Sequence, residues 1–396
     1  MNTQTQLVIL IIILSMFGLI SSDIYIPSLP FIAQTFHISG GEITFSISVY
    51  LIALAISQII YGVILNSYGY KRILTLGIII YIIASIGCAL SNQIYSFLFF
   101  RFFQGIGAAS GLVIGRYLIS SQFSKDQSVQ IYAIVYPFVS LSPAIAPLIG
   151  GYLTSYIGWK SNFYFLVIFA IIALYMTFKT PIKESKSDLK SIVFFQFISI
   201  LKNINFWRYT GVVCLIYQAW FIYLTQSTFV FKIFYGLSSE ITGLLYLPLS
   251  AGIILANITT KKLLRFLSID QIIGLGLIFF CIGGILFLSN LFLPQPSLTK
   301  IIFSMFIVSI ANGSSLSLAV ASAIHSSNEH TVAASGLVGF FQISSSGLIS
   351  YWISHCIGQS ISILSLSIFT LSTLCIFLFF FKFQYIDILK KTKLLR

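Results

Sequence analysis

Few residues of this chain could do chemistry, and the most telling of them lies inside apolar sequence. Asp23 falls late in a long apolar run and is soon followed by Pro27 and Pro30. A carboxylate in hydrocarbon costs about 2.5–3.5 kcal/mol at a helix centre, so the one kept inside such a run points to a function. Burial disfavours the charged form, which would let Asp23 exchange a proton near neutral pH. The alternative is an ionised, solvated carboxylate at the membrane surface.

A cation lies in a comparable position. Arg101 opens the string Arg101–Ala109, and spacings of three and four place Arg101, Gln104 and Ala108 on one face of a helix. A lone arginine inside a membrane span faces protein or a wet cavity rather than lipid. Its charge could act on the proton of Asp23 across a low-dielectric cavity. A purely structural arginine bonded to backbone carbonyls is the other interpretation.

The elements that must hold these residues are membrane helices. The chain is 58% hydrophobic and 8% charged, with a mean hydropathy of +0.99. Runs long enough for a spanning helix, about 20 residues, recur near 7–29, 43–65, 73–90, 94–118, 129–153, 161–178, 207–231, 241–258, 271–293, 301–324, 332–354 and 361–381. We therefore predict an all-α polytopic membrane protein with twelve transmembrane helices and both termini on one side.

The distribution of Lys and Arg predicts the orientation. Counting the chain ends and alternate loops as one side, the other side holds only Lys160, Lys232 and Lys300. The positive-inside rule then places both termini in the cytoplasm, in an inner (plasma) membrane. The net charge of +13 follows from these loops and from contact with lipid headgroups rather than from nucleic-acid binding. The first run has no preceding basic residue, so we expect a helix there and not a signal peptide.

The hydropathy pattern also predicts two similar halves. A polar stretch and a short apolar segment, 192–201, interrupt the runs in the middle of the chain, and the short segment suits an interfacial helix. We expect a six-helix half over 1–178, a cytoplasmic linker over 179–206, a second six-helix half over 207–381 and a basic tail over 382–396. Two duplicated halves with a substrate site between them at mid-membrane describe one common transporter architecture.

Three strings resemble signatures of the major facilitator transporters, and the resemblance extends over essentially the whole chain. The loop after the second run contains Gly62, Asn66, Gly69, Lys71 and Arg72 at the family's spacing. A glycine would permit close helix packing at its start and a tight turn at its centre. Asparagine stands where the family has aspartate, so any ion-pair latch built there is reduced to a neutral hydrogen bond.

The other two strings lie within predicted spans. Arg101–Ala109 matches the family's Arg-x-x-Gln-Gly-x-Gly-Ala-Ala signature without a gap, and the resemblance associates this arginine with proton coupling. The string Ser142–Gly151 is similar to a signature of the superfamily's antiporters, although Ser142 and Ala146 replace two usual glycines. Prolines and small residues bend and thin a helix so that a neighbour can approach closely. The residues of this string that we assign are Pro143, Pro147, Gly150 and Gly151. An ordinary kinked helix is the alternative.

Together with Asp23–Pro30, these strings resemble the bicyclomycin and chloramphenicol resistance (Bcr/CflA) branch of drug:proton antiporters. That resemblance implies proton-coupled export of lipophilic or cationic small molecules by alternating access, with Asp23 and Arg101 coupling the proton. Polar or aromatic residues at helical spacing are candidates for the substrate cavity, although each is also typical of an interhelical hydrogen bond. They are Tyr25, Tyr50, Gln58, Tyr61, Gln104, Gln218, Tyr223, Gln226, Asn312 and Gln342.

Other functions fit the sequence less well. No zincin, nucleophile-elbow or Walker motif occurs, and no carboxylate pair falls inside a span, so we predict neither an enzyme nor an ATP-driven pump. No spacing of His or Cys suggests a metal site, and no cofactor is expected. The expected partners are a small-molecule substrate, protons and the bilayer, with the protein as a monomer. A nutrient or metabolite carrier of the same fold stays open as the alternative, and a transport-dead sensor is a more distant one.

Overall fold

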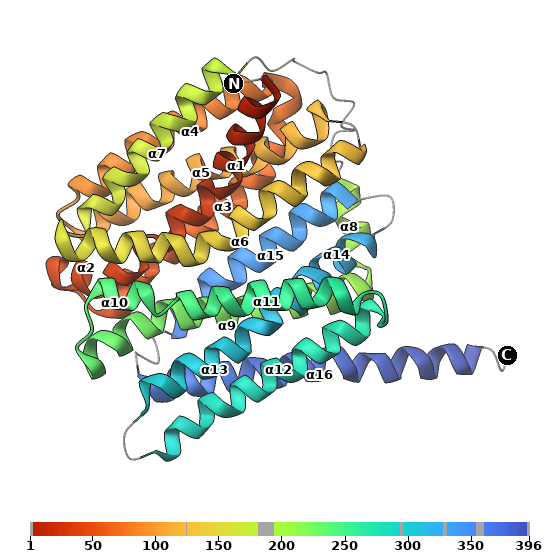
Figure 1. Ribbon diagram of the computed structural model, residues 1–396. Coiled ribbons are helices and arrows are strands. Elements are labelled where there is room, and N and C mark those ends of the chain that lie inside the picture. Colours follow the sequence, from red (N-terminus) through yellow and green to blue (C-terminus); the bar gives the residue numbers. More distant parts are fainter. Residues whose placement is uncertain are drawn as a thin grey trace. The chain divides into compact units, whose positions relative to one another are not determined.

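The chain folds into helices throughout its described part, and this confirms the predicted all-α class (Figure 1). The computed structural model describes residues 3–123, 125–180, 194–293, 296–327, 331–353 and 360–393, and some side chains within these ranges lie outside the description. The elements of the first part are α1 (Thr3–Asp23), η1 (Ile26–Ser28), α2 (Leu29–Phe36), α3 (Gly40–Tyr68), α4 (Tyr70–Leu90), α5 (Ile94–Gln122), α6 (Lys125–Tyr156) and α7 (Lys160–Lys179).

The second part begins with the short helix predicted for the middle of the chain. Its elements are α8 (Phe194–Leu201), α9 (Ile204–Tyr235), α10 (Ser239–Leu244), α11 (Leu247–Leu263), α12 (Ile269–Leu288), η2 (Ser289–Phe292), α13 (Leu298–Ala311), η3 (Asn312–Leu316), α14 (Ser317–His325), α15 (Thr331–Trp352) and α16 (Ile361–Lys393). Helix α8 matches the expected segment 192–201, and its place along the membrane face stays a prediction.

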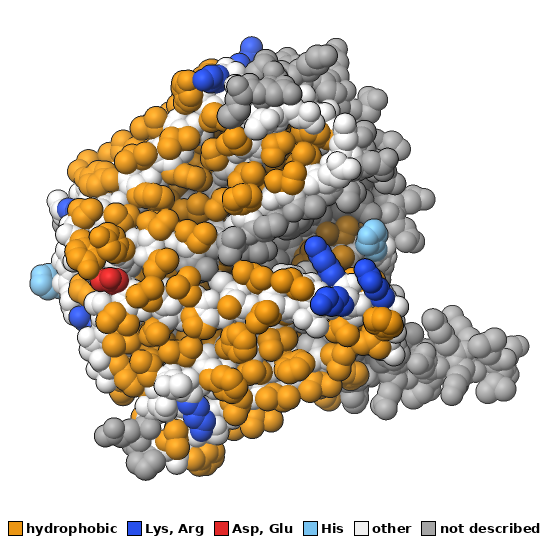
Figure 2. Space-filling view, viewed as in Figure 1, with side chains coloured by type: hydrophobic (Ala, Val, Ile, Leu, Met, Phe, Trp, Pro, Cys, Tyr) orange, Lys and Arg blue, Asp and Glu red, His pale blue; other side chains and the backbone are white. Residues whose placement is uncertain are grey.

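Ten helical segments of the described residues are long and apolar enough to cross a membrane. Helices α6 and α15 cover the other two expected runs, 129–153 and 332–354. Large apolar side chains are exposed at regular spacing, as at Leu76, Ile83 and Leu90 on one side of α4. Hydrophobic side chains cover much of the described surface in Figure 2. Such exposure suits lipid rather than water.

Several expected spans are interrupted within the described residues, among them 241–258, where α10 ends at Leu244 and α11 begins at Leu247. The first run contains a break, because α1 ends at Asp23 and a 3-10 turn, η1, precedes α2. Pro27 lies inside that turn and Pro30 in the first turn of α2, where a missing N–H is tolerated. The run 301–324 contains a π-helical turn, η3, between α13 and α14. Single π turns of this kind are frequent at functional sites.

The chain divides into two compact units. The first comprises Met1–Ile192, Thr228–Leu247 and Tyr351–Gly358, and the second comprises the remaining segments, Val193–Ser227, Pro248–Ser350 and Gln359–Arg396. The expected boundaries of the duplicated halves, at 178 and 207, stay a prediction.

Helix α5 is central to the first unit, because it packs against α1, α3 and α4. A Cβ added at Gly105 would overlap the carbonyl oxygen of Tyr50 on α3, and one at Gly107 would meet Gly77 and Tyr81 on α4. Glycine therefore lets the backbone of α5 lie directly on two neighbouring helices. This packing fixes the interior face on which Arg101 and Gln104 lie.

Candidate functional site

Arg101 lies completely buried in the first unit, between two aromatic rings. Its guanidinium carbon is 4.4 Å from the centroid of the Tyr25 ring and 4.2 Å from that of Tyr50. Nη2 donates a hydrogen bond to the Tyr25 hydroxyl at 3.1 Å, and Nη1 donates to Oε1 of Gln104 at 2.5 Å. Two ring faces and two oxygen acceptors thus replace the water that a buried cation loses.

This arrangement confirms that Arg101 and Gln104 share a helix face. The same contacts disfavour the alternative that Arg101 is a purely structural residue bonded mainly to backbone carbonyls. Among the described residues, one backbone acceptor contacts the guanidinium, the Ser21 carbonyl at 3.3 Å from Nη1, and Nε has no partner. The aromatic enclosure holds the positive charge at a defined place beside the end of α1.

A second layer of polar residues was missed by the sequence reasoning. Gln104 donates from Nε2 to the Ser85 hydroxyl at 2.7 Å, and the hydroxyls of Tyr25 and Ser46 are 3.0 Å apart. Tyr81 and Ser21 share a hydrogen bond. One signal was available: Tyr81 and Ser85 lie four residues apart on one helix, as do Ser46 and Tyr50, so each pair marks a polar face in apolar sequence.

Asp23 is the last residue of α1 and only 4% exposed. The Ser22 hydroxyl donates to its Oδ1 at 2.8 Å. Burial of this degree disfavours the interpretation of a solvated carboxylate. No ion pair joins Asp23 to Arg101 within the described ranges, and the bonded route between them passes through the Ser21 carbonyl. Any effect of Arg101 on Asp23 therefore acts through space or through the backbone.

The other predicted cavity residues do not join this cluster. On α3, Tyr61 is buried, and Oε1 of Gln58 accepts a long bond, 3.4 Å, from Arg116. Five further candidates belong to the second unit: Gln218, Tyr223, Gln226, Asn312 and Gln342.

Among these five, the α9 residues are the most enclosed. Gln218, Tyr223 and Gln226 are all buried on α9, and Gln218 donates from Nε2 to the Ser350 hydroxyl at 3.3 Å. This bond between helices is the alternative that the sequence left open for these residues. Asn312 begins the π-helical turn, and Gln342 is half-buried on α15. Their role as substrate contacts stays a prediction.

The string Ser142–Gly151 packs closely, as its small residues predicted. A Cβ on Gly150 would overlap the Ile24 carbonyl, directly after Asp23, and a Cβ on Gly151 would overlap the Ser239 carbonyl of α10. One turn further along the same contact, Gly243 of α10 lies against the Pro147 carbonyl. Helix α6 stays continuous through Pro143 and Pro147. We call this contact of α6 with the end of α1 and with α10 the glycine seam.

Enlarging either seam glycine should reduce transport. Gly150→Val and Gly151→Val each force a side chain into a neighbouring backbone, and overpacking of this kind displaces helices rather than being absorbed. We expect a several-fold loss of transport with little loss of protein from the membrane. Gly339→Val is the control, because no described atom lies within 4 Å of a Cβ there. Normal transport by both seam variants would show that transport does not depend on this close packing.

The loop signature is confirmed at its turn and wrong at its start. Gly69 has a φ of +75° and separates α3 from α4, a conformation that glycine adopts without strain. No described atom lies within 4 Å of a Cβ on Gly62, so close helix packing does not require glycine there. Lys71 lies 5.6 Å from the Phe178 ring centroid, and Arg72 is exposed. The side chain of Asn66 is outside the described residues.

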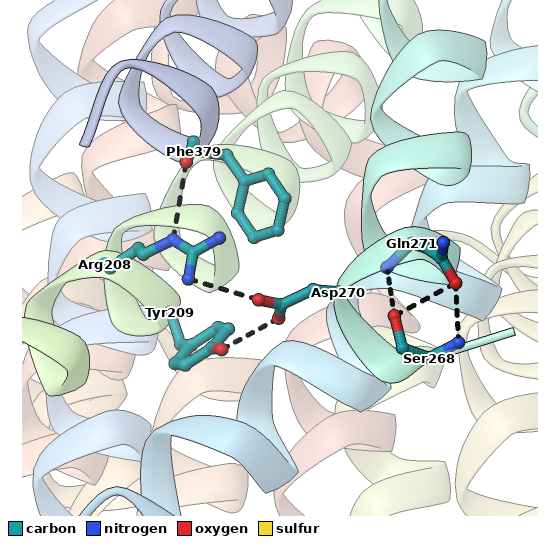
Figure 3. A network of polar contacts seen from close by, with 6 residues as sticks. All are labelled: Arg208, Tyr209, Ser268, Asp270, Gln271 and Phe379. Atoms are coloured by element: carbon teal, nitrogen blue, oxygen red, sulfur yellow. Dashed lines mark hydrogen bonds and ion pairs between the residues drawn. The ribbon is translucent and has the colours of Figure 1, made fainter. Parts of the chain in front are cut away.

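A second charged cluster, in the second unit, was also missed (Figure 3). Arg208 pairs with Asp270 at 3.3 Å, and the Tyr209 hydroxyl donates to the same carboxylate at 2.8 Å. The Arg208 guanidinium also lies 4.2 Å from the Phe379 ring centroid. The cluster joins the first turns of α9 and α12 to α16. The signal available in the sequence was a pair of opposite charges, Arg208 and Asp270, at the ends of two predicted spans.

Comparison with known proteins agrees with this architecture. The chain is 25% identical over 352 residues to a bicyclomycin resistance protein homolog of Haemophilus influenzae, covering 86% of this chain and 87% of the relative. It is 24% identical over 341 residues to chloramphenicol resistance protein CraA of Acinetobacter baumannii, covering 84% and 82%. These relatives confirm the predicted resemblance to the bicyclomycin and chloramphenicol resistance branch.

Solved structures show the same fold. The crystal structure of a D-xylose-proton symporter matches with a TM-score of 0.73 at 14% identity, covering 96% of this chain and 98% of that one. At 14% identity this match supports the fold and nothing about the substrate. A family model described as Major Facilitator Superfamily matches residues 11–351. Because that match spans most of its length, the chain belongs to the Major Facilitator Superfamily and is a transporter, not an enzyme.

Proposed function

We propose that the protein is a proton-coupled efflux antiporter that exports lipophilic or cationic small molecules. The observation that carries the proposal is the pair of buried charged residues near the end of α1. Asp23 is the last residue of this helix, and the carbonyl of Ser21, two residues earlier, accepts a hydrogen bond from the buried Arg101. Buried ionisable groups inside membrane spans mark proton or substrate pathways. The names of the two resistance relatives support a drug as the cargo.

The mechanism we propose is alternating access around a central cavity. In the inward-open state, deprotonated Asp23 helps to hold the substrate. On the outer side, protonation of Asp23 removes that charge and releases the substrate, so proton entry drives substrate exit. Arg101 stabilises the charged form of Asp23 through space and so sets when the proton is taken up.

The remaining parts of the proposal concern the orientation in the membrane, the boundaries of the two halves and the oligomeric state. The charge distribution of the loops supports an inner (plasma) membrane location with both termini in the cytoplasm. We propose that 1–178 and 207–381 are duplicated six-helix halves, that 179–206 is a cytoplasmic linker and 382–396 a basic tail, and that the monomer is the working unit. In this orientation the glycine seam lies at the outer side of the membrane, where it would prevent ion leak.

Proton flux in inside-out vesicles tests the direction of coupling. With an acidified lumen, adding a true substrate should release protons from the lumen, seen as recovery of a quenched pH dye. Substrates would come from a drug panel screened first by efflux from a susceptible bacterial host. The matched control is the Asp23→Asn protein in the same vesicles, which should give no recovery.

The opposite signal would change the assignment. If substrate addition acidifies the lumen further, substrate and proton move together, and a symporting carrier of a nutrient or metabolite replaces the antiporter. If no drug in the panel produces a signal but a metabolite does, the fold and the coupling residues stand while the cargo is reassigned.

A further inference from the structure

The backbone break after Asp23 is held from two sides. On one side Gly150 of α6 lies against the carbonyl of Ile24, the residue that follows Asp23. On the other side the Ser239 hydroxyl of α10 donates a hydrogen bond to the Pro27 carbonyl at 2.8 Å. Both contacts are with backbone atoms, so no flexible side chain of the break absorbs a displacement. A shift of the break therefore displaces α6 or α10 unless one of these contacts is lost.

Helix α10 is tied to α6 as well. The Glu240 amide donates to the Ser155 hydroxyl at 3.1 Å, and Gly151 lies against the Ser239 carbonyl. Ser239 is 1% exposed. Ser239 therefore makes two contacts: its carbonyl contacts α6, and its hydroxyl contacts the break after α1.

The break is also bonded through side chains to α6 and α7. The hydroxyls of Ser28 and Thr154 lie 2.6 Å apart, and Asn162 donates from Nδ2 to both, at 2.7 and 2.9 Å. All three residues are buried. These bonds keep the break attached to the rest of the first unit when α10 moves. Movement of α10 away from the break therefore requires loss of the Ser239 bond, not of this triad.

We propose that Ser239 is a positioning residue of the transport cycle, whose hydrogen bond to the Pro27 carbonyl links the glycine seam to the segment that carries Asp23. Opening the seam breaks this bond and separates α10 from the break after α1, which stays bonded to α6 and α7. Conversely, a change in the charge of Asp23 shifts the break and reaches α10 through the same bond. The seam itself is argued from contacts alone, whereas the link to Asp23 rests on the function proposed above.

Cysteine accessibility measures the seam without any drug or proton gradient. Thr242 is 2% exposed on α10, and its own hydroxyl bonds only within that turn. In a transport-competent background lacking the native cysteines, Thr242→Cys would be labelled by a soluble maleimide in lipid nanodiscs, where both membrane faces are reachable. We expect Ser239→Ala to speed labelling about fivefold, the effect of losing one hydrogen bond of ordinary strength.

A matched variant distinguishes weaker contact between α6 and α10 from loss of the hydrogen bond between Ser239 and Pro27. Ser155→Ala removes the hydrogen bond that the Glu240 amide of α10 donates to α6 and leaves Ser239 bonded to Pro27, so it should also speed labelling. Ser304→Ala is the neutral control, because that hydroxyl bonds only the Lys300 carbonyl of its own helix. Asp23→Asn is then added to each background, and the two changes are compared as a double-mutant cycle.

The link predicts a specific pattern. Asp23→Asn should change the labelling rate at least twofold in the reference and Ser155→Ala backgrounds, and should have no effect in the Ser239→Ala background. An equal response to Asp23→Asn in all backgrounds would overturn the link, and so would its loss in Ser155→Ala. Unchanged labelling in Ser239→Ala would overturn the positioning role of Ser239. Failure of drug efflux leaves these rates unaffected, so the two proposals fail separately.

Discussion

Asp23→Asn should leave the protein folded in the membrane and abolish proton-driven efflux. The amide is close in shape to the carboxylate and can still accept a hydrogen bond from Ser22. It carries no exchangeable charge, however, so the proposed uptake and release of a proton cannot occur. Drug resistance in a susceptible host and dye recovery in vesicles should both fall to the level of the empty membrane, while the amount of protein in the membrane is unchanged.

Glu42→Gln is the matched control for this prediction. Glu42 also changes from carboxylate to amide, but it is exposed and forms the capping box of α3 with Ser39. Glutamine serves the same capping role, so resistance should be retained. Wild-type resistance in the Asp23→Asn strain at equal expression would show that the coupling carboxylate lies elsewhere.

Arg101→Ala should lose transport, and Arg101→Lys should retain part of it. Alanine empties the space between the Tyr25 and Tyr50 rings and leaves the buried Gln104 oxygen without its donor. An unsatisfied buried polar group costs about 1–3 kcal/mol, which corresponds to a loss in rate of about 5- to 160-fold. Lysine keeps the charge but lacks the planar fork that reaches several acceptors at once. Initial rates of efflux at equal protein level provide the measurement.

Arg116→Ala is the control on the same helix. Arg116 is exposed and makes a single long bond, 3.4 Å, to Gln58, so its loss should change the rate little. Equal activity of wild type, Arg101→Ala and Arg101→Lys would return Arg101 to a structural role. Loss of the Arg101→Ala protein from the membrane, with Arg101→Lys fully active, would do the same.

Much of the fold could be predicted because its causes are local. Apolar runs of spanning length gave the helices, and proline and glycine gave the break after Asp23 and the turn at Gly69. The pairing of Arg101 with Gln104 also follows from local geometry, since residues three apart share a helix face. The Gly62 prediction failed because close packing depends on a partner helix that a single string does not specify.

The sequence by itself determined the membrane helices and the residues whose burial would be costly enough to imply a function, since hydropathy and backbone preference act over a few neighbouring residues. Only the tertiary structure decided that Tyr25 and Tyr50 enclose Arg101, that Ser239 reaches the Pro27 carbonyl, and that Arg208 meets Asp270. Each of these contacts joins residues far apart in the chain. Their formation depends on how helix surfaces fit together. Small residues such as Gly150 and Gly151 permit close packing but do not specify which helix packs against them.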